Sequence, residues 1–189
     1  MAIKRFFADS DSTITNAMKE GLSATVRGDE ANMGKSDIIE VFSIFGQITG
    51  SINQPDESQE LSRILIQFPV SSISAARTKD EIPGSGSVNF FLKLYNAEHS
   101  QNVPENFTLA VLPVAQEWQE GVGLDMDNYS DKGAVSWINR KDDTAWTTVG
   151  GHYHSEPIYS ASFDTGLEDL CVDISTLVEE WIAGTKTNY

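Results

Sequence analysis

Apolar and polar residues alternate most regularly in the run 61–70. In an extended chain one face of this run is apolar and carries Ile64, Ile66, Phe68 and Val70. The other face carries Arg63, Gln67 and Pro69, and Leu65 alone departs from the alternation. The pattern predicts a half-buried β-strand that ends near Pro69, because proline cannot donate a hydrogen bond to a neighbouring strand.

The same alternation predicts a second strand over 88–95. One face would carry Val88, Phe90, Leu92 and Leu94, and the other Asn89, Phe91, Lys93 and Tyr95. Shorter runs predict strands at 3–7, 12–17, 36–45, 107–115, 158–163 and 167–174. The segment 18–34 gives conflicting signals, and 46–60 and 71–87 are predicted as loops because they are rich in turn-forming residues.

The last part of the chain predicts one short helix. Residues 176–179 have the sequence Thr-Leu-Val-Glu, which fits a capping box. One face of the following helix would carry Leu177, Val178, Trp181 and Ile182, and Gly184 would end it. Upstream, three tryptophans lie in the loop-rich region 116–159, where large aromatics are expected to close the open end of a β-sandwich: Trp118, Trp137 and Trp146.

Short strands, long polar loops and one terminal helix indicate an all-β fold, a two-sheet jelly-roll β-sandwich, more than an alternating βαβ scheme. A chain of 189 residues is long enough to bury roughly 70% of its unfolded surface as one domain. No segment of the sequence has the composition of a linker, so we expect residues 1–189 to form a single domain.

The net charge of the chain disfavours two classes of binding partner. Asp and Glu number 28 against 13 Lys and Arg, a formal net charge of −15. Such a chain repels phosphate backbones and anionic lipid, so we expect neither nucleic acid nor a membrane as a partner. The N-terminus lacks the apolar core of a signal peptide and no apolar run is long enough for a membrane helix, which predicts folding in a cytoplasm.

Two short motifs could hold a metal ion, and each also has a simpler interpretation. The loop from Asp125 to Asp131 places oxygen ligands at alternate positions, as calcium requires, but it lacks the glycine and the glutamate of an EF-hand. A solvated acidic loop is the alternative. His152 and His154 have the spacing of a transition-metal pair, although a third ligand would have to be the distant His99; two surface histidines are the alternative.

No motif predicts catalysis. Glu117 and Glu120 could be paired as general acid and base, but sequence spacing does not fix their separation in space. Nucleophile elbows, phosphate loops and dinucleotide fingerprints are absent from the sequence. Cys171, the single cysteine, lies in an apolar strand pattern and is predicted to be a buried small residue. We therefore expect no enzyme, no catalytic, cofactor-binding or metal-binding residue, and no cofactor.

Several segments together resemble the DNRLRE-type jelly-roll domains. They are 32–41 (NMGKSDIIEV), 62–73 (SRILIQFPVSSI), 118–121 (WQEG), 136–137 (SW), 146–151 (WTTVGG) and 172–181 (VDISTLVEEW), followed by Gly184. The resemblance covers about residue 8 to the C-terminus. It implies a two-sheet jelly roll with structural Trp and Gly-Gly positions, in a family used for attachment, adhesion and sometimes polysaccharide binding.

The whole sequence, and its opening 1–17 above all, also looks like structural proteins of marine tailed phages. That likeness implies a virion protein, as a capsid decoration, neck or tail-associated subunit, which folds in the host cytoplasm. Its partners would be other virion proteins and copies of itself, with aromatic residues of 116–159 as anchors. The alternative is a carbohydrate-binding or adhesion module, with an exposed Trp or Tyr against a sugar and calcium in the Asp125 loop.

Overall fold

A computed structural model describes residues 3–20, 25–45, 59–100, 102–126 and 131–189. The chain forms two compact units, each built from separated segments. The first unit contains residues 1–7, 68–115 and 153–188; the second contains 8–67 and 116–152, together with Tyr189. A single domain over 1–189 stays a prediction.

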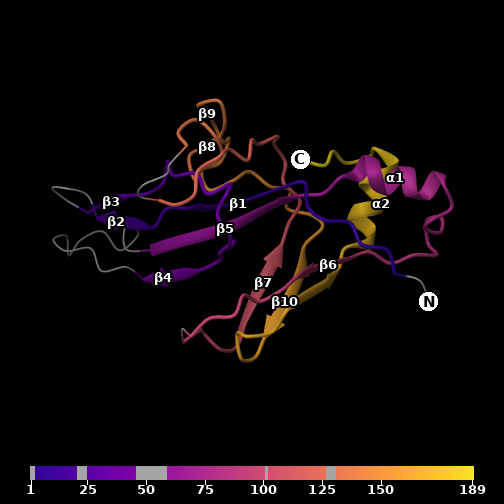
Figure 1. Ribbon diagram of the computed structural model, residues 1–189, viewed down its shortest axis with the longest axis horizontal. Helices are drawn as coiled ribbons and strands as arrows, with labels where there is room; N and C mark the ends of the chain where they lie inside the picture. The colour runs from indigo at the N-terminus through magenta and orange to yellow at the C-terminus, as the bar shows by residue number, and fades with distance from the viewer. Residues whose placement is uncertain (1–2, 21–24, 46–58, 101, 127–130) are drawn as a thin grey trace. The chain divides into compact units, whose positions relative to one another are not determined.

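A three-stranded antiparallel sheet forms the centre of the second unit. Its strand order is β1-β5-β4, from β1 (Ser10–Thr15), β5 (Gln59–Gln67) and β4 (Ser43–Phe45). β1 lies along β5 over its whole length, from Ser10 opposite Gln67 to Thr15 opposite Ser62 (Figure 1). Two small antiparallel pairs complete the unit: β2 (Met18–Glu20) with β3 (Thr25–Arg27), and β8 (Asn139–Lys141) with β9 (Thr144–Ala145).

β5 is the strand predicted from the run 61–70, but its buried face differs from the prediction. Leu65, the residue that breaks the alternation, is buried, whereas Ile64 and Ile66 are half-buried. Ser62 is also buried, and its hydroxyl donates to the carbonyl of Glu40 and accepts from the N–H of Phe42. Leu65 and Ser62 lie on opposite faces of β5, so both faces of this strand are partly covered.

The three tryptophans of the loop-rich region are packed inside the second unit, as predicted. Trp118, Trp137 and Trp146 are each at most 7% exposed. The indole N–H of Trp146 donates to the carbonyl of Ser136 at 3.0 Å, and the Arg63 guanidinium lies 5.1 Å from the centre of the Trp137 ring. The loops are therefore ordered around a buried aromatic core.

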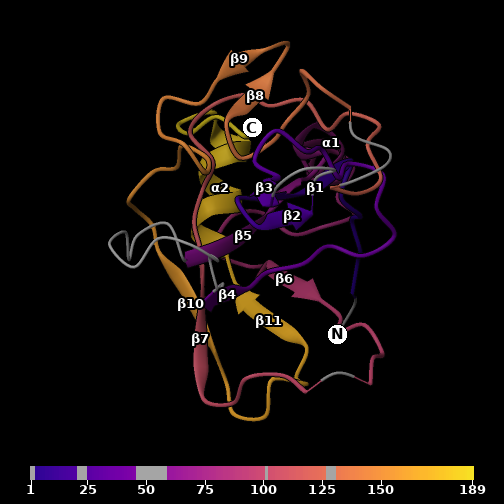
Figure 2. The same cartoon turned by 90° about the vertical axis from the view of Figure 1, so that its left-hand side faces the viewer.

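The described residues of the first unit form two antiparallel strand pairs and two helices. β7 (Phe107–Val111) pairs with β10 (Tyr159–Phe163), and β6 (Phe91–Leu94) pairs with β11 (Leu170–Asp173). Figure 2 shows β6 beside β11 and β7 beside β10. The apolar core of this unit joins the strands to the helices through residues such as Leu92, Phe163, Leu170, Val172 and Val178.

The helices differ from the sequence-based prediction in two respects. Helix α1 (Val70–Thr78) occupies part of the segment 71–87, which was predicted as a loop. Helix α2 (Ser175–Ala183) ends at Gly184 in a left-handed conformation, as predicted, but it begins after Ile174, whose side chain makes no capping hydrogen bond, so the predicted capping box is wrong. The carboxylate of Glu179 instead binds Arg77 of α1, and the N–H of Leu177 donates to the Tyr159 hydroxyl.

The all-β class with a short C-terminal helix is confirmed, since strands dominate and both helices are short. Several strands are shorter than predicted: 3–7 is not a strand, and only Ser43–Phe45 of 36–45 is one. The segment 18–34, whose signals conflict, contains β2 and β3. The jelly-roll connection of the strands stays a prediction. None of the described helices is both long and apolar enough to span a bilayer.

Candidate interaction surface

The β6·β11 sheet has one buried and one exposed face. Leu92 of β6 and Leu170 and Val172 of β11 are buried in the core of the first unit. The residues between them point outward and are exposed: Phe91, Lys93 and Tyr95 from the β6 side, and Cys171 and Asp173 from β11. The sequence predicted this division of β6 correctly, because alternation decides which side chains share a face.

Two aromatic side chains dominate the exposed face. Phe91 is 55% exposed and Tyr95 is 70% exposed. Phe91 begins β6 and Tyr95 directly follows its last residue, with Lys93 between them and Cys171 directly opposite Lys93. Large apolar side chains on the outside of a sheet are informative when they gather in this way, because burying them against a partner would be favourable.

The exposure of Cys171 differs from the sequence-based prediction. It was predicted to be buried, but it is exposed. The physical reason is the pleat of β11: Leu170 and Val172 occupy the inward positions, so the residue between them must point outward.

The outer edge of β6 is a further feature of this surface. The N–H of Ile174 donates to the carbonyl of Phe90 at 2.9 Å, so Phe90 and Leu92 direct their backbone groups toward β11. The backbone groups of Phe91 and Lys93 therefore face the other way. Within the described part of the chain no strand pairs with β6 on that side. An unpaired strand edge is a natural place for another chain to bind.

The acidic residue of the exposed face is held in its charged form. Asp173 accepts hydrogen bonds from the hydroxyl and the N–H of Ser175 and from the Asn89 amide. These bonds lower the pKa of Asp173 below its ordinary value. Lys93 is the basic residue of the same face, so the surface combines aromatic groups with one charge of each sign.

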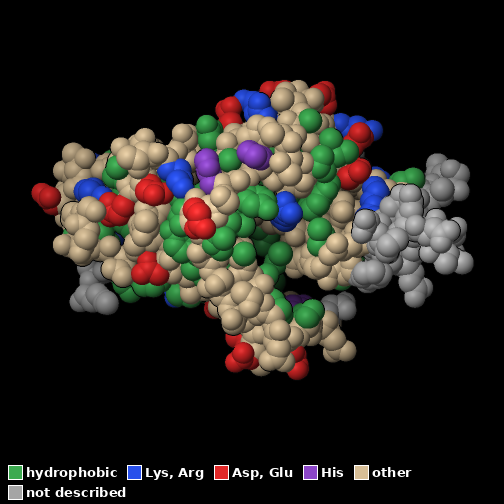
Figure 3. Space-filling view, turned by 180° about the vertical axis from the view of Figure 1, so that it is seen from behind, with side chains coloured by type: hydrophobic (Ala, Val, Ile, Leu, Met, Phe, Trp, Pro, Cys, Tyr) green, Lys and Arg blue, Asp and Glu red, His purple; other side chains and the backbone are tan. Residues whose placement is uncertain are grey.

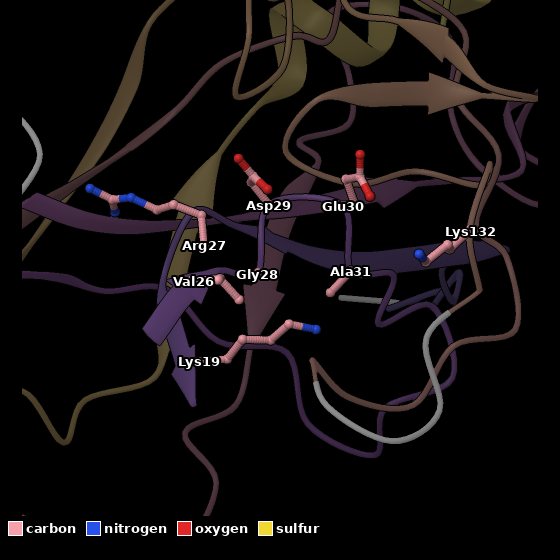
Figure 4. Close-up of a pocket in the computed structure, with 8 residues that line it drawn as sticks. All are labelled: Lys19, Val26, Arg27, Gly28, Asp29, Glu30, Ala31 and Lys132. Carbon is pink, nitrogen blue, oxygen red and sulfur yellow. The ribbon is translucent and has the colours of Figure 1, made fainter. Parts of the chain in front are cut away.

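A small pocket lies in the second unit, beside the β2·β3 pair. Its volume is about 230 Å³, and it is lined by Lys19, Val26, Arg27, Gly28, Asp29, Glu30, Ala31 and Lys132 (Figure 4). The amino groups of Lys19 and Lys132 extend toward one another in Figure 4, whereas Arg27 extends away. Lys19 also donates to the carbonyl of Met126 at 2.8 Å. Because acidic and basic groups are mixed in the lining, the pocket favours no single ligand charge.

The candidate calcium loop lies partly outside the described residues, which exclude 127–130. Of its described members, Asp131 accepts the N–H of Val122 at 2.9 Å. His152 contacts the hydroxyl of Thr148 through its Nδ1 at 3.2 Å and belongs to the second unit, whereas His154 belongs to the first. Among the residues that the structure describes, no three His, Cys, Asp or Glu side chains are grouped to hold a metal ion.

Glu117 and Glu120 are engaged by different lysines. Lys141 binds Glu117 and lowers its pKa, which does not suit a general acid. Glu120 binds Lys35 at 2.6 Å and accepts the N–H of Asp11 at 3.0 Å. Burial, with the nearby charge of Glu120, raises the pKa of Asp11. The carboxylates thus form two separate charge clusters, not the Glu117–Glu120 pair that the sequence allowed.

The predicted aromatic anchors are revised for the tryptophans, whereas Tyr153 of the same region is 45% exposed. Trp118, Trp137 and Trp146 are core residues and cannot bind a partner at the surface. On the face drawn in Figure 3, acidic and basic side chains are interspersed, with apolar groups between them.

No family model, curated protein or solved structure matches this chain. Among the described residues, the exposed face and outer edge of β6 form the best-defined candidate site. Alternation in the sequence predicted the face, but it did not predict the strand edge.

Proposed function

We propose that this chain is a structural virion protein of a tailed phage, a capsid decoration, neck or tail-associated subunit, that acts by binding other virion proteins. The observation that carries the proposal is the β6 surface, where Phe91 and Tyr95 are exposed beside a strand edge that none of the described strands pairs with. Such a surface gains free energy when another protein covers its apolar groups and pairs its backbone.

The sequence supports the viral part of the proposal. The segments that resemble DNRLRE-type jelly rolls, and the likeness to marine phage structural proteins, point to a building block of a particle. The chain would fold in the host cytoplasm and then enter the virion. Its net charge of −15 favours protein partners over nucleic acid or an anionic membrane.

Quantitative mass spectrometry of purified virions tests the proposal. We expect peptides of this chain at a fixed ratio to the major structural proteins across independent preparations. A chain that is abundant in infected cells but lost from the particles on purification would contradict the proposal. The measurement requires no knowledge of which virion protein is the neighbour.

The carbohydrate-binding alternative has weaker support, because the three tryptophans of 116–159 are buried and cannot stack on a sugar. Tyr95 remains an exposed aromatic residue, so a glycan array is a useful control. Specific binding that a chelator abolishes would favour the calcium-dependent module. Absence of binding at every glycan would leave assembly as the better explanation.

A further inference from the structure

We propose that the outer edge of β6 pairs antiparallel with the same edge of a second copy of this chain. The two β6·β11 sheets would then join into one four-stranded sheet across a two-fold axis. This inference rests on the proposed function, assembly through the β6 surface, and names the partner at that surface.

The backbone of β6 supplies the hydrogen-bonding groups. Because Phe90 and Leu92 bond toward β11, the N–H and C=O groups of Phe91 and Lys93 project from the opposite edge. No hydrogen bond to these four groups is found among the described residues. A copy of the same edge offers donors and acceptors with the same spacing, so the two edges can satisfy one another.

Charge and the length of β6 together select one register for this pairing. The outward-bonding residues can meet as Phe91 opposite the copy's Lys93, as Lys93 opposite the copy's Lys93, or as Phe91 opposite the copy's Phe91. The last of these leaves Lys93 opposite the copy's Asn89, which lies outside β6. The second arrangement places two ammonium groups directly opposite on the exposed face, which is unfavourable. The first places each ammonium beside an aromatic ring, where a cation is attracted to the ring face. It also allows Phe91 and Lys93 to exchange both of their backbone hydrogen bonds twice across the axis.

A second copy suits the edge better than an unrelated strand for a geometric reason. In the selected register every outward group of Phe91 and Lys93 finds a partner, and no like charges face one another. A two-fold interface also closes on itself, so the edge is used up in the dimer and does not propagate into a fibre. The paired surface is small, so we expect a reversible dimer.

Amide hydrogen exchange of the unmodified chain tests the pairing. At low concentration the Phe91 and Lys93 amides should exchange rapidly. At high concentration both should become protected, in step with the dimer fraction that sedimentation velocity measures. The Leu92 amide, which faces β11, should be protected at both concentrations and serves as the internal reference.

Two variants of one residue isolate the backbone contribution. Lys93→Pro removes the outward N–H, at a position where an edge strand tolerates proline. Lys93→Ala removes the charge but keeps the N–H. We expect Lys93→Pro to weaken dimerisation at least tenfold and Lys93→Ala to retain it. If Lys93→Pro does not fold, the exchange experiment on the unmodified chain still decides.

A chain that stays monomeric at every concentration overturns the inference, as does a dimer whose Phe91 and Lys93 amides exchange as fast as in the monomer. Incorporation into particles separates this failure from failure of the proposed function. If particles accept Lys93→Ala but exclude Lys93→Pro while the purified chain is monomeric, the edge binds a different virion protein. Self-pairing is then wrong and the proposed function stands. If the unmodified chain itself is absent from particles, the proposed function is wrong.

Discussion

Asn32 organises the loops of the second unit although it is a polar residue with no exposed surface. Its amide nitrogen donates to the carbonyls of Glu120 and Val135 at 2.6 and 2.8 Å. Its amide oxygen accepts the N–H of Gly123 at 2.8 Å and that of Gly34 at 3.3 Å. One side chain thus ties its own loop to residues 120–123 and to Val135, which lie 88 to 103 residues further along the sequence.

We expect Asn32→Asp to lower the free energy of unfolding by about 3 kcal/mol or more, because a group that donated two buried hydrogen bonds becomes an acceptor facing two carbonyls. Urea unfolding measures the change. The exposed Asn102 provides the matched control, and Asn102→Asp should leave the unfolding midpoint nearly unchanged. Equal effects at the two positions would mean that the Asn32 bonds do not stabilise the fold.

Gly150 illustrates a second kind of residue-level constraint. It has a φ of 88°, and a Cβ there would lie 2.7 Å from Cζ2 of Trp137. We expect Gly150→Ala to destabilise the protein by about 2 to 4 kcal/mol through backbone strain and overpacking. Gly84 has open space around it, so Gly84→Ala should be close to neutral in the same thermal unfolding assay. A neutral Gly150→Ala would contradict a structural role for this glycine.

At the scale of elements, an ion pair joins the two helices of the first unit. Arg77 of α1 donates to both carboxylate oxygens of Glu179 on α2, each at 2.7 Å. Both side chains are largely covered, with 19% and 22% of their surfaces exposed. This bond lowers the pKa of Glu179 and raises that of Arg77. Bidentate pairs of this kind fix geometry as well as charge.

Glu179→Gln should lower the free energy of unfolding by about 1 to 2 kcal/mol at neutral pH. Because the folded-state pKa of Glu179 is lowered, its contribution is present above the unfolded-state pKa and is lost as the pH falls through the folded value. The difference between the two proteins should therefore shrink in acid. Glu81, paired with Lys4 on the surface, gives the control: Glu81→Gln should change the urea midpoint little. A Glu179 effect that grows in acid would contradict the ion-pair explanation.

Local alternation predicted the strand faces, whereas elements that depend on contacts distant in sequence were missed. Alternation over 88–95 was enough to place Leu92 on one face and Phe91 and Lys93 on the other, and the structure shows that the face of Leu92 is the buried one. Helix α1 was missed because few of its residues are buried, among them Ile73 and Ala76, and because a contact to Glu179, 102 residues away, stabilises it. The edge of β6 was also beyond prediction, since it depends on which strands fail to reach it in the fold.

For the whole molecule, the acidic charge opposes self-association. Two copies with a net charge of −15 each repel one another. Salt screens this repulsion, whereas backbone pairing at β6 depends little on salt. We therefore expect sedimentation velocity to show a larger dimer fraction in high NaCl than in low NaCl. A dimer that dissociates when salt is added would indicate an interface made of opposite charges, contrary to the one proposed.

The central claim is that the chain is a particle subunit that uses the outer edge of β6. A density map of the intact virion tests it most directly. The account predicts that the map contains this fold, with Phe91 and Lys93 within hydrogen-bonding distance of a neighbouring chain and Tyr95 covered. A map in which the chain is found with that edge and Tyr95 facing solvent, or is not found, would contradict the account.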